Sequence, residues 1–366
     1  MLDNNICQLL ALVKDAVTEQ DKCSADRVNW NDIARMSKRQ GISAIVFDAI
    51  ENLPTTQRPE KPLLLKWIGQ TMMMEEMYAG HKEQIAVLAE FYKKHGIPML
   101  LLKGYGCSLC YPKPEHRPTG DMDIFLFGKQ EEADQAVEKE LGVTVHRAYH
   151  KHSTFGFNGV EVENHSKFID DVSHKSNIRF EQILMRTLKD YPCIESPIDN
   201  VLLPSPTFNA LFLLRHAGEH FASNEITIRH ILDIGTFFRC YHSDIDWSFV
   251  FQVYERERMR TFFNGIATIC VEYLGIDPEC FGSGDNHYYS YEKDLPLADR
   301  ILADVFEKKE HLAMSTAGIN TARQKMNYII GKTHRWWHNR WKYKLVYNES
   351  LVESFLWLAK NRLKSF

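Results

Sequence analysis

The chain has 366 residues, of which 44% are hydrophobic, 12% aromatic and 25% charged, and its formal net charge is −4 at pH 7. This composition is typical of a soluble globular protein and excludes collagen-like, low-complexity and disordered chains. The small negative charge also excludes, for the chain as a whole, a protein that coats nucleic acid. The length predicts two or three domains, with a core large enough to be stable without disulfides or a structural metal.

The N-terminal sequence and the cysteine content predict the cellular compartment. The first residues contain no basic segment followed by an apolar run, so we expect no signal peptide. No apolar run reaches the length of about 18 residues that a transmembrane helix needs. The eight cysteines are scattered along the chain, which is typical of a reducing environment. We therefore expect a cytoplasmic protein with no transmembrane segment.

Residues 1–95 have the spacing of apolar side chains that is typical of helices. A long amphipathic helix is expected over residues 65–95, because Gly96 and Pro98 follow it as a stop signal. Within this helix, the methionine-rich run 72–77 predicts a buried methionine face. We assign residues 1–95 to an N-terminal helical region.

The pattern changes to a small α/β unit over residues 96–172. Short apolar runs after glycine or proline predict buried strands, and alternating segments around an Asn-Gly turn at 158–159 predict a hairpin. The expected strands cover residues 98–103, 122–127, 143–149, 153–157 and 160–166. The expected helices cover residues 105–111 and 130–141.

Helical periodicity returns from residue 173 onward. The expected helices cover residues 178–190, 206–222, 226–241, 247–259, 261–274, 297–312 and 320–335. We assign residues 173–320 to a helical domain and residues 321–366 to a basic, aromatic C-terminal segment. The sequence thus predicts an α+β protein, in which a small sheet is flanked by N-terminal and C-terminal helical regions.

Two aspartates, Asp121 and Asp123, are the most informative residues. Side chains on a strand alternate between its faces, so both carboxylates point the same way while Met122 and Ile124 point toward the core. Neighbouring carboxylates repel each other, and a divalent cation such as Mg²⁺ commonly relieves this repulsion. An isolated Asp-x-Asp is more often a solvated acidic turn, so the surrounding elements have to support the interpretation as a metal site.

A later strand offers a third carboxylate. Glu161, Glu163 and His165 share one face of the expected strand 160–166. Either glutamate completes a two-metal site of the kind that phosphoryl-transfer enzymes use. The residue pattern leaves the choice between these glutamates open.

Glycine and cationic residues upstream of the aspartates suit an anionic substrate. Gly104 ends a strand at the start of an expected helix, where backbone amides can approach phosphate oxygens. Lys103 and Arg117 carry the charge that neutralises a triphosphate. The implied reaction is attack of an acceptor oxygen on the α-phosphate, with departure of pyrophosphate.

The order of these residues matches the motif of a known family. The chain resembles the uncharacterised nucleotidyltransferase family, within the DNA polymerase beta-like nucleotidyltransferase superfamily, through Leu102-Lys103-Gly104, Tyr111-Pro112, Arg117-Pro118 and Gly120-Asp121-Met122-Asp123. The segment Val162-Glu163-Asn164-His165-Ser166 is similar to the next strand motif of that family, which favours Glu163 as the third carboxylate. A looser resemblance extends over most of the chain.

The resemblance implies a mixed, nucleotidyltransferase-type sheet and transfer of a nucleoside monophosphate from an NTP, with Mg²⁺ or alternatively Mn²⁺ in a two-metal site. Acceptors in this superfamily include small molecules, proteins and RNA, so the acceptor stays unidentified. The resemblance implies Asp121, Asp123 and Glu163 as catalytic and metal-binding residues. The residues that it implies in nucleotide binding are Lys103, Gly104, Arg117 and Gly120.

Two histidines on an expected helix suggest a different enzyme. His216 and His220 are one helical turn apart, and together with Asp233 they resemble the ligand sets of metal-dependent phosphohydrolases. Two other interpretations compete with this one. The histidines, together with Arg229, line the nucleotide or acceptor cleft, or they are buried residues with structural hydrogen bonds.

The C-terminal segment 321–366 differs in charge from the rest of the chain. Ten Lys or Arg residues and two Glu give it a formal charge of +8, which leaves −12 for residues 1–320, and it contains four of the seven Trp. The stretch 332–344 interleaves cations with aromatic rings, as do surfaces that bind single-stranded nucleic acid, other phosphate-rich partners or anionic membranes. The alternative is a terminal helix that docks its Trp face on the acidic body.

This segment also defines a second class of function. The alternative is a catalytically silent protein that keeps the fold. Such a protein binds a nucleotide or acts as a scaffold, and it holds an anionic partner with its basic C-terminal segment. The aspartate pair argues for the enzyme, because a silent copy has no need of a costly carboxylate cluster.

Overall fold

The computed structural model describes the chain between residues 2 and 357 with several gaps. The described residues are 2–18, 28–147, 150–170, 172, 174–223, 225–283, 287–307, 336–354 and 356–357. No helix within these ranges is both long and apolar enough to cross a bilayer. The expected helix 320–335 lies outside the described residues.

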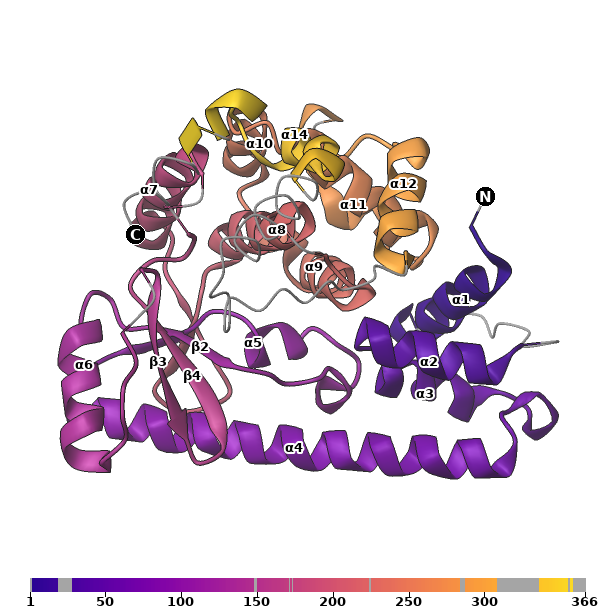
Figure 1. Ribbon diagram of the computed structural model, residues 1–366, viewed down its shortest axis with the longest axis horizontal. Helices are drawn as coiled ribbons and strands as arrows, with labels where there is room; N and C mark the ends of the chain where they lie inside the picture. Colours follow the sequence, from indigo (N-terminus) through magenta and orange to yellow (C-terminus); the bar gives the residue numbers. More distant parts are fainter. Residues whose placement is uncertain are drawn as a thin grey trace, which may run out of the picture.

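In the described part of the N-terminal region, four α-helices are present: α1 (Asn4–Thr18), α2 (Trp30–Gln40), α3 (Ser43–Asn52) and α4 (Lys61–Lys94). The first three pack together, and α4 extends from beneath them to the far side of the sheet (Figure 1). The expected long helix is therefore confirmed. It has Pro62 in its first turn, where a missing N–H costs nothing, and Gly96 follows its end with a φ of 65°.

The methionine run on α4 is exposed, so the prediction of a buried methionine face is wrong. Met72, Met73 and Met77 are 56%, 62% and 61% exposed, respectively. The buried face of α4 instead contains Trp67 in its N-terminal half and residues such as Leu88 near its C-terminal end. These three methionines point away from the buried face of α4.

Six strands form one mixed sheet in the order β3-β4-β2-β1-β6-β5. They are β1 (Met99–Leu101), β2 (Met122–Phe125), β3 (His152–Phe157), β4 (Val160–His165), β5 (Ile194–Glu195) and β6 (Val201–Leu203). β2 runs parallel to β4 and β1 parallel to β6, and the other three pairs are antiparallel. The predicted α+β class, with a small mixed sheet flanked by helical regions, is confirmed.

The expected and observed strands differ in two places. The β3–β4 hairpin turns at Asn158 and Gly159, both with positive φ, as the Asn-Gly signal predicts. The expected strand 143–149 is wrong over its described residues 143–147, where only His146 forms a bridge, to Thr154. Strands β5 and β6 are not expected from the sequence, because two or three residues are too few to show a period of two.

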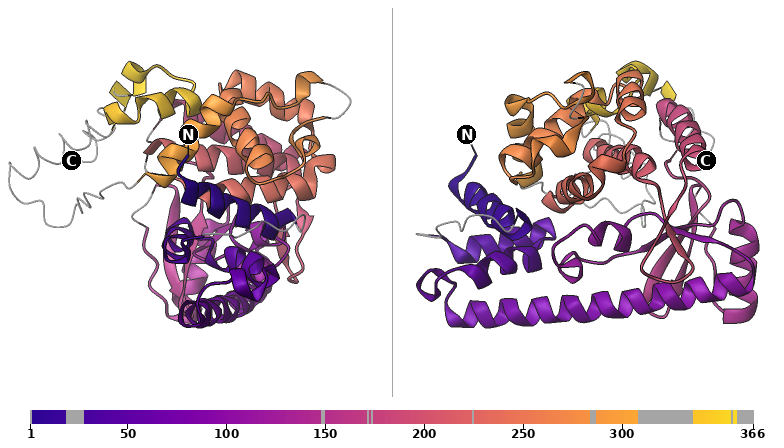
Figure 2. Two further views of the ribbon diagram at one scale, coloured as in Figure 1. Left: turned by 90° about the vertical axis from the view of Figure 1, so that its right-hand side faces the viewer. Right: turned by 180° about the vertical axis from the view of Figure 1, so that it is seen from behind.

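The two faces of the sheet pack against different helices. Met122 and Ile124 on β2 join a core that includes Leu88 of α4. Phe125, which points to the opposite face, joins the larger core of the C-terminal helices with Phe212. Both views of Figure 2 place α4 and the C-terminal helices on opposite sides of the sheet. The face that carries Asp123 is therefore the one that looks toward the C-terminal helices.

Short helical segments connect the strands, and longer helices follow them. The connecting segments are α5 (Tyr105–Ser108), a 3₁₀ turn at Pro114–His116, and α6 (Gln130–Ala136), which continues as a π-helical turn at Val137–Leu141. The longer helices are α7 (Lys175–Asp190), α8 (Pro206–Ser223), α9 (Ile228–Tyr241), α10 (Trp247–Arg256), α11 (Arg260–Glu272), α12 (Leu295–Phe306) and α14 (Arg340–Val346).

The described part of the C-terminal segment docks on the helical domain. Lys342 on α14 is fully buried, and its Nζ lies 2.6 Å from an oxygen of Asp304 on α12. The Trp341 ring packs edge-on against Phe221 of α8, with 5.3 Å between the ring centroids. The sequence of the stretch 332–344 suggests a surface for an anionic partner. Because Lys342 is buried, it cannot contribute to such a surface. Residues 332–335 of that stretch lie outside the described residues.

Candidate active site

Parallel pairing of β2 with β4 brings the predicted carboxylates together. Asp123 and Glu163 are direct partners in the register of the two strands, so their side chains share one face of the sheet. Asp121 lies one residue before β2, at the exposed edge of the same face. Glu161 is also exposed, whereas Glu163 is half-buried. The geometry thus places Glu163, rather than Glu161, beside the buried Asp123.

Two cationic or polar side chains surround the buried Asp123. Its Oδ1 lies 2.8 Å from Nζ of Lys103 and 3.0 Å from Nε2 of His165. Burial raises the pKa of Asp123, but the nearby Lys103 ammonium and the His165 ring overcome this effect and hold that pKa below its usual range. Asp123 is therefore ionised at neutral pH.

Asp121 differs from Asp123 in having no hydrogen bond or ion pair with any residue that the structure describes. Partial burial, together with the charges of Glu163 and Asp123, raises the pKa of Asp121. Negative charge at this edge of the sheet thus exceeds the positive charge that the chain supplies. A donor set of carboxylate oxygens with excess negative charge fits a divalent cation such as Mg²⁺.

The turn after β1 directs Lys103 toward the carboxylates. Gly104 has φ 59° and ψ −108°, a conformation that only glycine adopts without strain, and it lets the chain turn sharply into α5. Lys103 precedes this turn, which is why its ammonium reaches Asp123 in the neighbouring strand. Gly120 is exposed immediately before Asp121, with open space around it.

Arg117 occupies a different place from the one that the sequence suggests. Its guanidinium donates two hydrogen bonds to the carboxylate of Asp233 on α9, at 3.0 and 2.9 Å, and a third to the carbonyl of Pro118. Tyr111 donates another hydrogen bond to Asp233, at 2.8 Å. Because Arg117 and Asp233 are both buried, Arg117 anchors the loop before β2 to the helical domain. The prediction that Arg117 binds phosphate does not fit this geometry.

The helices opposite the carboxylates present a row of histidines. The rings of His216 and His220 on α8 lie 4.6 Å apart, and that of His230 on α9 lies 5.7 Å from His220. Burial lowers the pKa of His220 to about 4 and that of His230 to about 3, and the charge of Lys103 contributes at His220. These rings are therefore neutral at pH 7 and form one wall of the space above the sheet.

The phosphohydrolase interpretation does not fit this wall. Its third ligand, Asp233, already accepts hydrogen bonds from Arg117 and Tyr111. His216, His220 and Asp233 also do not approach one another as a metal-ligand group among the described residues. Burial is the main cause of the lowered pKa of His230, and the positive charge of Arg229, at the start of α9, lowers that pKa further. The structure thus agrees better with histidines that line a cleft or stabilise the fold.

Two residues of the site give no clear signal in the sequence. Lys151 lies just before β3, and the charges of Lys103 and of nearby carboxylates such as Asp123 and Glu163 act on its amine. Burial, followed by the charge of Lys103, lowers the pKa of Lys151. His152 is the register partner of His165 and lies beside Glu163. A His-Lys-His run at 150–152 is the only local signal for either residue.

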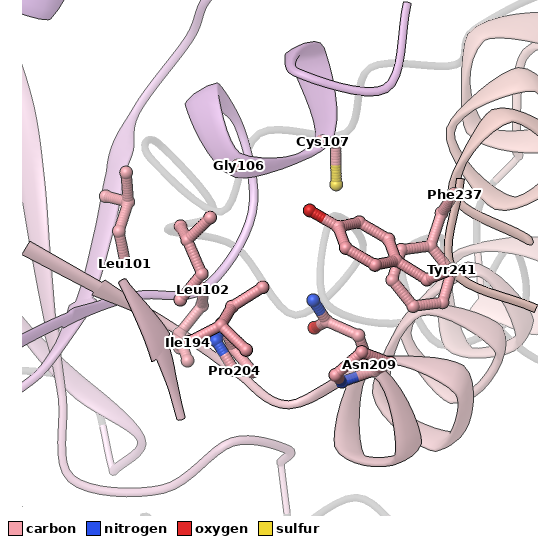
Figure 3. A pocket seen from close by; sticks show the side chains of 11 residues that line it. Leu101, Leu102, Gly106, Cys107, Ile194, Pro204, Asn209, Phe237 and Tyr241 are labelled. Atoms are coloured by element: carbon pink, nitrogen blue, oxygen red, sulfur yellow. The ribbon is translucent and has the colours of Figure 1, made fainter. Parts of the chain in front are cut away.

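A small pocket near the sheet contains none of these groups. Figure 3 shows it between the ends of β1 and β6, α5 and the helical domain, with Leu101, Cys107 and Tyr241 among the side chains that line it. Most of its lining is apolar, and Asp121, Asp123 and Glu163 are absent from it. We therefore place the chemistry at the carboxylate face, because reactions of charged substrates need charged groups in reach.

The sheet, the paired carboxylates and the sequence motif define a class, the nucleotidyltransferases. The chain belongs to the uncharacterised nucleotidyltransferase family, whose family model matches residues 26–275, more than half of the chain. This result confirms the family that the motif at residues 102–123 suggests.

Comparisons with individual proteins add little to the family assignment. No curated protein sequence matches the chain. A similar solved structure is the crystal structure of an antigenic nucleotidyltransferase-like protein from Paracoccidioides brasiliensis, which is 17% identical. The similarity covers 43% of this chain and 75% of that chain, with a TM-score of 0.31. A similarity this low supports no residue-level argument.

Proposed function

We propose that the protein transfers a nucleoside monophosphate from an NTP to an acceptor that the structure does not identify, with release of pyrophosphate. Membership of the nucleotidyltransferase family supports nucleotidyl transfer in general. The observation that best supports the proposal is the register pairing of Asp123 with Glu163, next to Asp121, on the sheet face that opposes α8. Three carboxylates on one face suit a metal–triphosphate substrate.

In this proposal, Asp121, Asp123 and Glu163 hold Mg²⁺, or alternatively Mn²⁺. When bound, such an ion withdraws charge from the phosphate oxygens and orients them. Lys103 lies 2.8 Å from Asp123, and the charges of Asp123 and Glu163 act on Lys151, so both cations suit the negative phosphates. Gly104 and Gly120 leave room for the substrate beside the backbone.

The chemical step of the proposal is one substitution at phosphorus. An acceptor oxygen bonds to the α-phosphorus, the bond from that phosphorus to the oxygen bridging to the β-phosphate breaks, and pyrophosphate leaves with the electron pair. Glu163 accepts the proton of the acceptor as a general base. Its proximity to His165, which lowers the pKa of Glu163 through a hydrogen bond, keeps it ionised for this role.

The proposal is tested by incubating the full-length protein with Mg²⁺, each α-labelled NTP in turn, and fractions of a cell lysate as acceptors. We expect label to pass to one fraction with the wild-type protein and transfer to disappear with Asp123→Ala. The control is Glu161→Gln, which removes an exposed carboxylate of the same strand face and should retain transfer. Loss of transfer in both variants, or its persistence in Asp123→Ala, would contradict the assignment.

A second candidate function is supported by one observation. Lys103 and His165 already contact Asp123, so the buried carboxylate is balanced without a metal ion. A protein that binds a nucleotide and transfers nothing needs no more than this. The same experiment separates the two functions, because NTP binding with no transfer to any fraction supports the binding protein.

A further inference from the structure

Two histidines gather around Glu163 and Asp123, two of the proposed magnesium ligands. His152 on β3, Glu163 and His165 on β4 each offer a ligand atom, and these atoms all lie within 4.8 Å of one another. Asp123 adjoins them, with its Oδ1 3.0 Å from Nε2 of His165. The cluster is half-buried to buried, so it is not an ordinary solvated group of surface charges.

The spacing of these atoms is that of ligands around one ion. His165 Nε2 lies 3.3 Å from Glu163 Oε2, and His152 Nδ1 lies 3.7 Å from the same oxygen. Ligand atoms about 2.0–2.2 Å from a tetrahedral ion lie roughly 3.3–3.6 Å apart. The strand register produces this spacing, because His152 pairs with His165 and Asp123 pairs with Glu163.

A hydrogen bond outside the cluster orients the central imidazole. The Nδ1 atom of His165 lies 3.2 Å from the carbonyl oxygen of Lys167. A proton on Nδ1 satisfies that carbonyl, so when an ion binds, Nε2 gives up the proton that it shares with Asp123 and Glu163 and becomes the ligand atom. Metal-binding histidines commonly have such a second hydrogen bond, which sets both the tautomer and the orientation of the ring.

The donor types indicate which ions fit. Mg²⁺ prefers carboxylate, phosphate and water oxygens, whereas imidazole nitrogen suits Zn²⁺, Co²⁺ and related transition-metal ions. We propose that His152, Glu163 and His165, with Asp123 beside them, form a binding site for one divalent transition-metal ion of the zinc class. Asp121, which does not group with the described histidines, stays outside this ligand set. The proposal does not depend on the transferase activity, because binding of the ion requires no nucleotide.

Cobalt titration of the full-length, metal-free protein tests the site directly. Four-coordinate Co²⁺ absorbs visible light strongly, so binding is followed without any enzymatic assay. We expect one Co²⁺ per chain, displaced by stoichiometric Zn²⁺ and not by millimolar Mg²⁺. Absence of the absorption band, or displacement of Co²⁺ by Mg²⁺ as readily as by Zn²⁺, would overturn the proposal and leave a proton on His165 as the bridge between the carboxylates.

Histidine variants assign the ligands. His152→Gln and His165→Ala should each weaken Co²⁺ binding at least tenfold, whereas His146→Ala should leave it unchanged, because His146 is an exposed histidine outside the cluster. Since His165 is buried, its variant is checked by thermal unfolding, and the half-buried His152 keeps the proposal testable if that variant does not fold. Equal loss of affinity in His146→Ala and His152→Gln would contradict the ligand set.

Discussion

Lys103 and Arg117 illustrate how the fold divides two cations that look alike in the sequence. Both belong to the motif at 102–123 and both suit a phosphate. Lys103 reaches Asp123 across the β1–β2 pair and stays partly exposed at the site. Arg117 is buried and paired with Asp233. Only Lys103, joined by Lys151, therefore remains available for an anionic substrate.

The Arg117–Asp233 pair should stabilise the protein strongly only as long as both partners are present. Asp233→Asn leaves a buried guanidinium without its counter-charge, and breaking a buried pair in this way costs about 3–5 kcal/mol. We expect urea unfolding to show a loss of this size. The exposed pair of Arg35 with Asp32 serves as the control, because Arg35→Met should change stability by less than about 1 kcal/mol. Similar losses in both variants would show that burial does not determine the contribution of the pair.

At the scale of elements, α4 contributes to two separate hydrophobic cores. Trp67 near its N-terminal end belongs to one core, and Leu88 near its C-terminal end belongs to the other. Its N-terminal half packs on α3 and its C-terminal end covers the sheet, and its buried positions from Trp67 to Tyr92 fall at helical spacing on one stripe along the helix. Met72, Met73 and Met77 lie off this stripe, which explains their exposure. Local periodicity cannot reveal which side a neighbouring element covers.

His116 should make the junction of α3 with α4 sensitive to pH. Burial lowers the pKa of His116, but its hydrogen bonds to Asp48 of α3 and Glu75 of α4 raise that pKa more, so the net shift is upward. The charge of Lys113, which binds Asp48 and Glu51, opposes this shift without reversing it. A raised folded-state pKa adds stability that is fully present below the unfolded-state pKa of about 6.5 and is lost as pH rises through the folded-state value.

The measurement compares the Tm of the wild-type protein with that of His116→Gln between pH 5.5 and 9. We expect the wild type to be more stable at the acidic end and this advantage to shrink as the pH rises. A difference in Tm that grows with pH would refute the assignment, since it would require a lowered pKa of His116 in the folded state.

For the whole molecule, the sheet lies between two helical layers. α4 covers one face, and α8 and α9 stand over the other (Figure 1). Strand alternation places the carboxylates on the face toward the C-terminal helices. α14 closes the far side of the helical domain by packing on α8. The described end of the chain thus contributes to the stability of the layer that forms the wall of the site.

The docking of α14 predicts different effects for two neighbouring lysines. Lys342→Ala breaks a buried ion pair with Asp304 and should destabilise the protein by about 3–5 kcal/mol. Lys344, on the same helix but exposed, should change stability by less than about 1 kcal/mol when replaced by Ala. Thermal and urea unfolding measure both. Equal and small losses of stability in the two variants would contradict the burial of Lys342 and would favour its place on a surface for an anionic partner.

The sequence alone determines the identity of the family and the face on which its carboxylates lie. Both depend on short-range rules: the motif at 102–123 is continuous in the chain, and the alternation of strand residues places Asp121 and Asp123 on one face and Met122 in the core. The length of α4 also follows from local periodicity and its end signals. These features need no knowledge of which elements are neighbours.

Only the tertiary structure decides what surrounds the carboxylates. The order and register of the strands pair Glu163 with Asp123 and bring His152 next to His165. Helix packing brings Asp233, 116 residues further along the chain, into contact with Arg117, so that Arg117 no longer faces the site. Such contacts bring together segments with independent local patterns. Their formation reflects the burial of both faces of the sheet, a free-energy term that belongs to the assembled molecule and not to any stretch of its sequence.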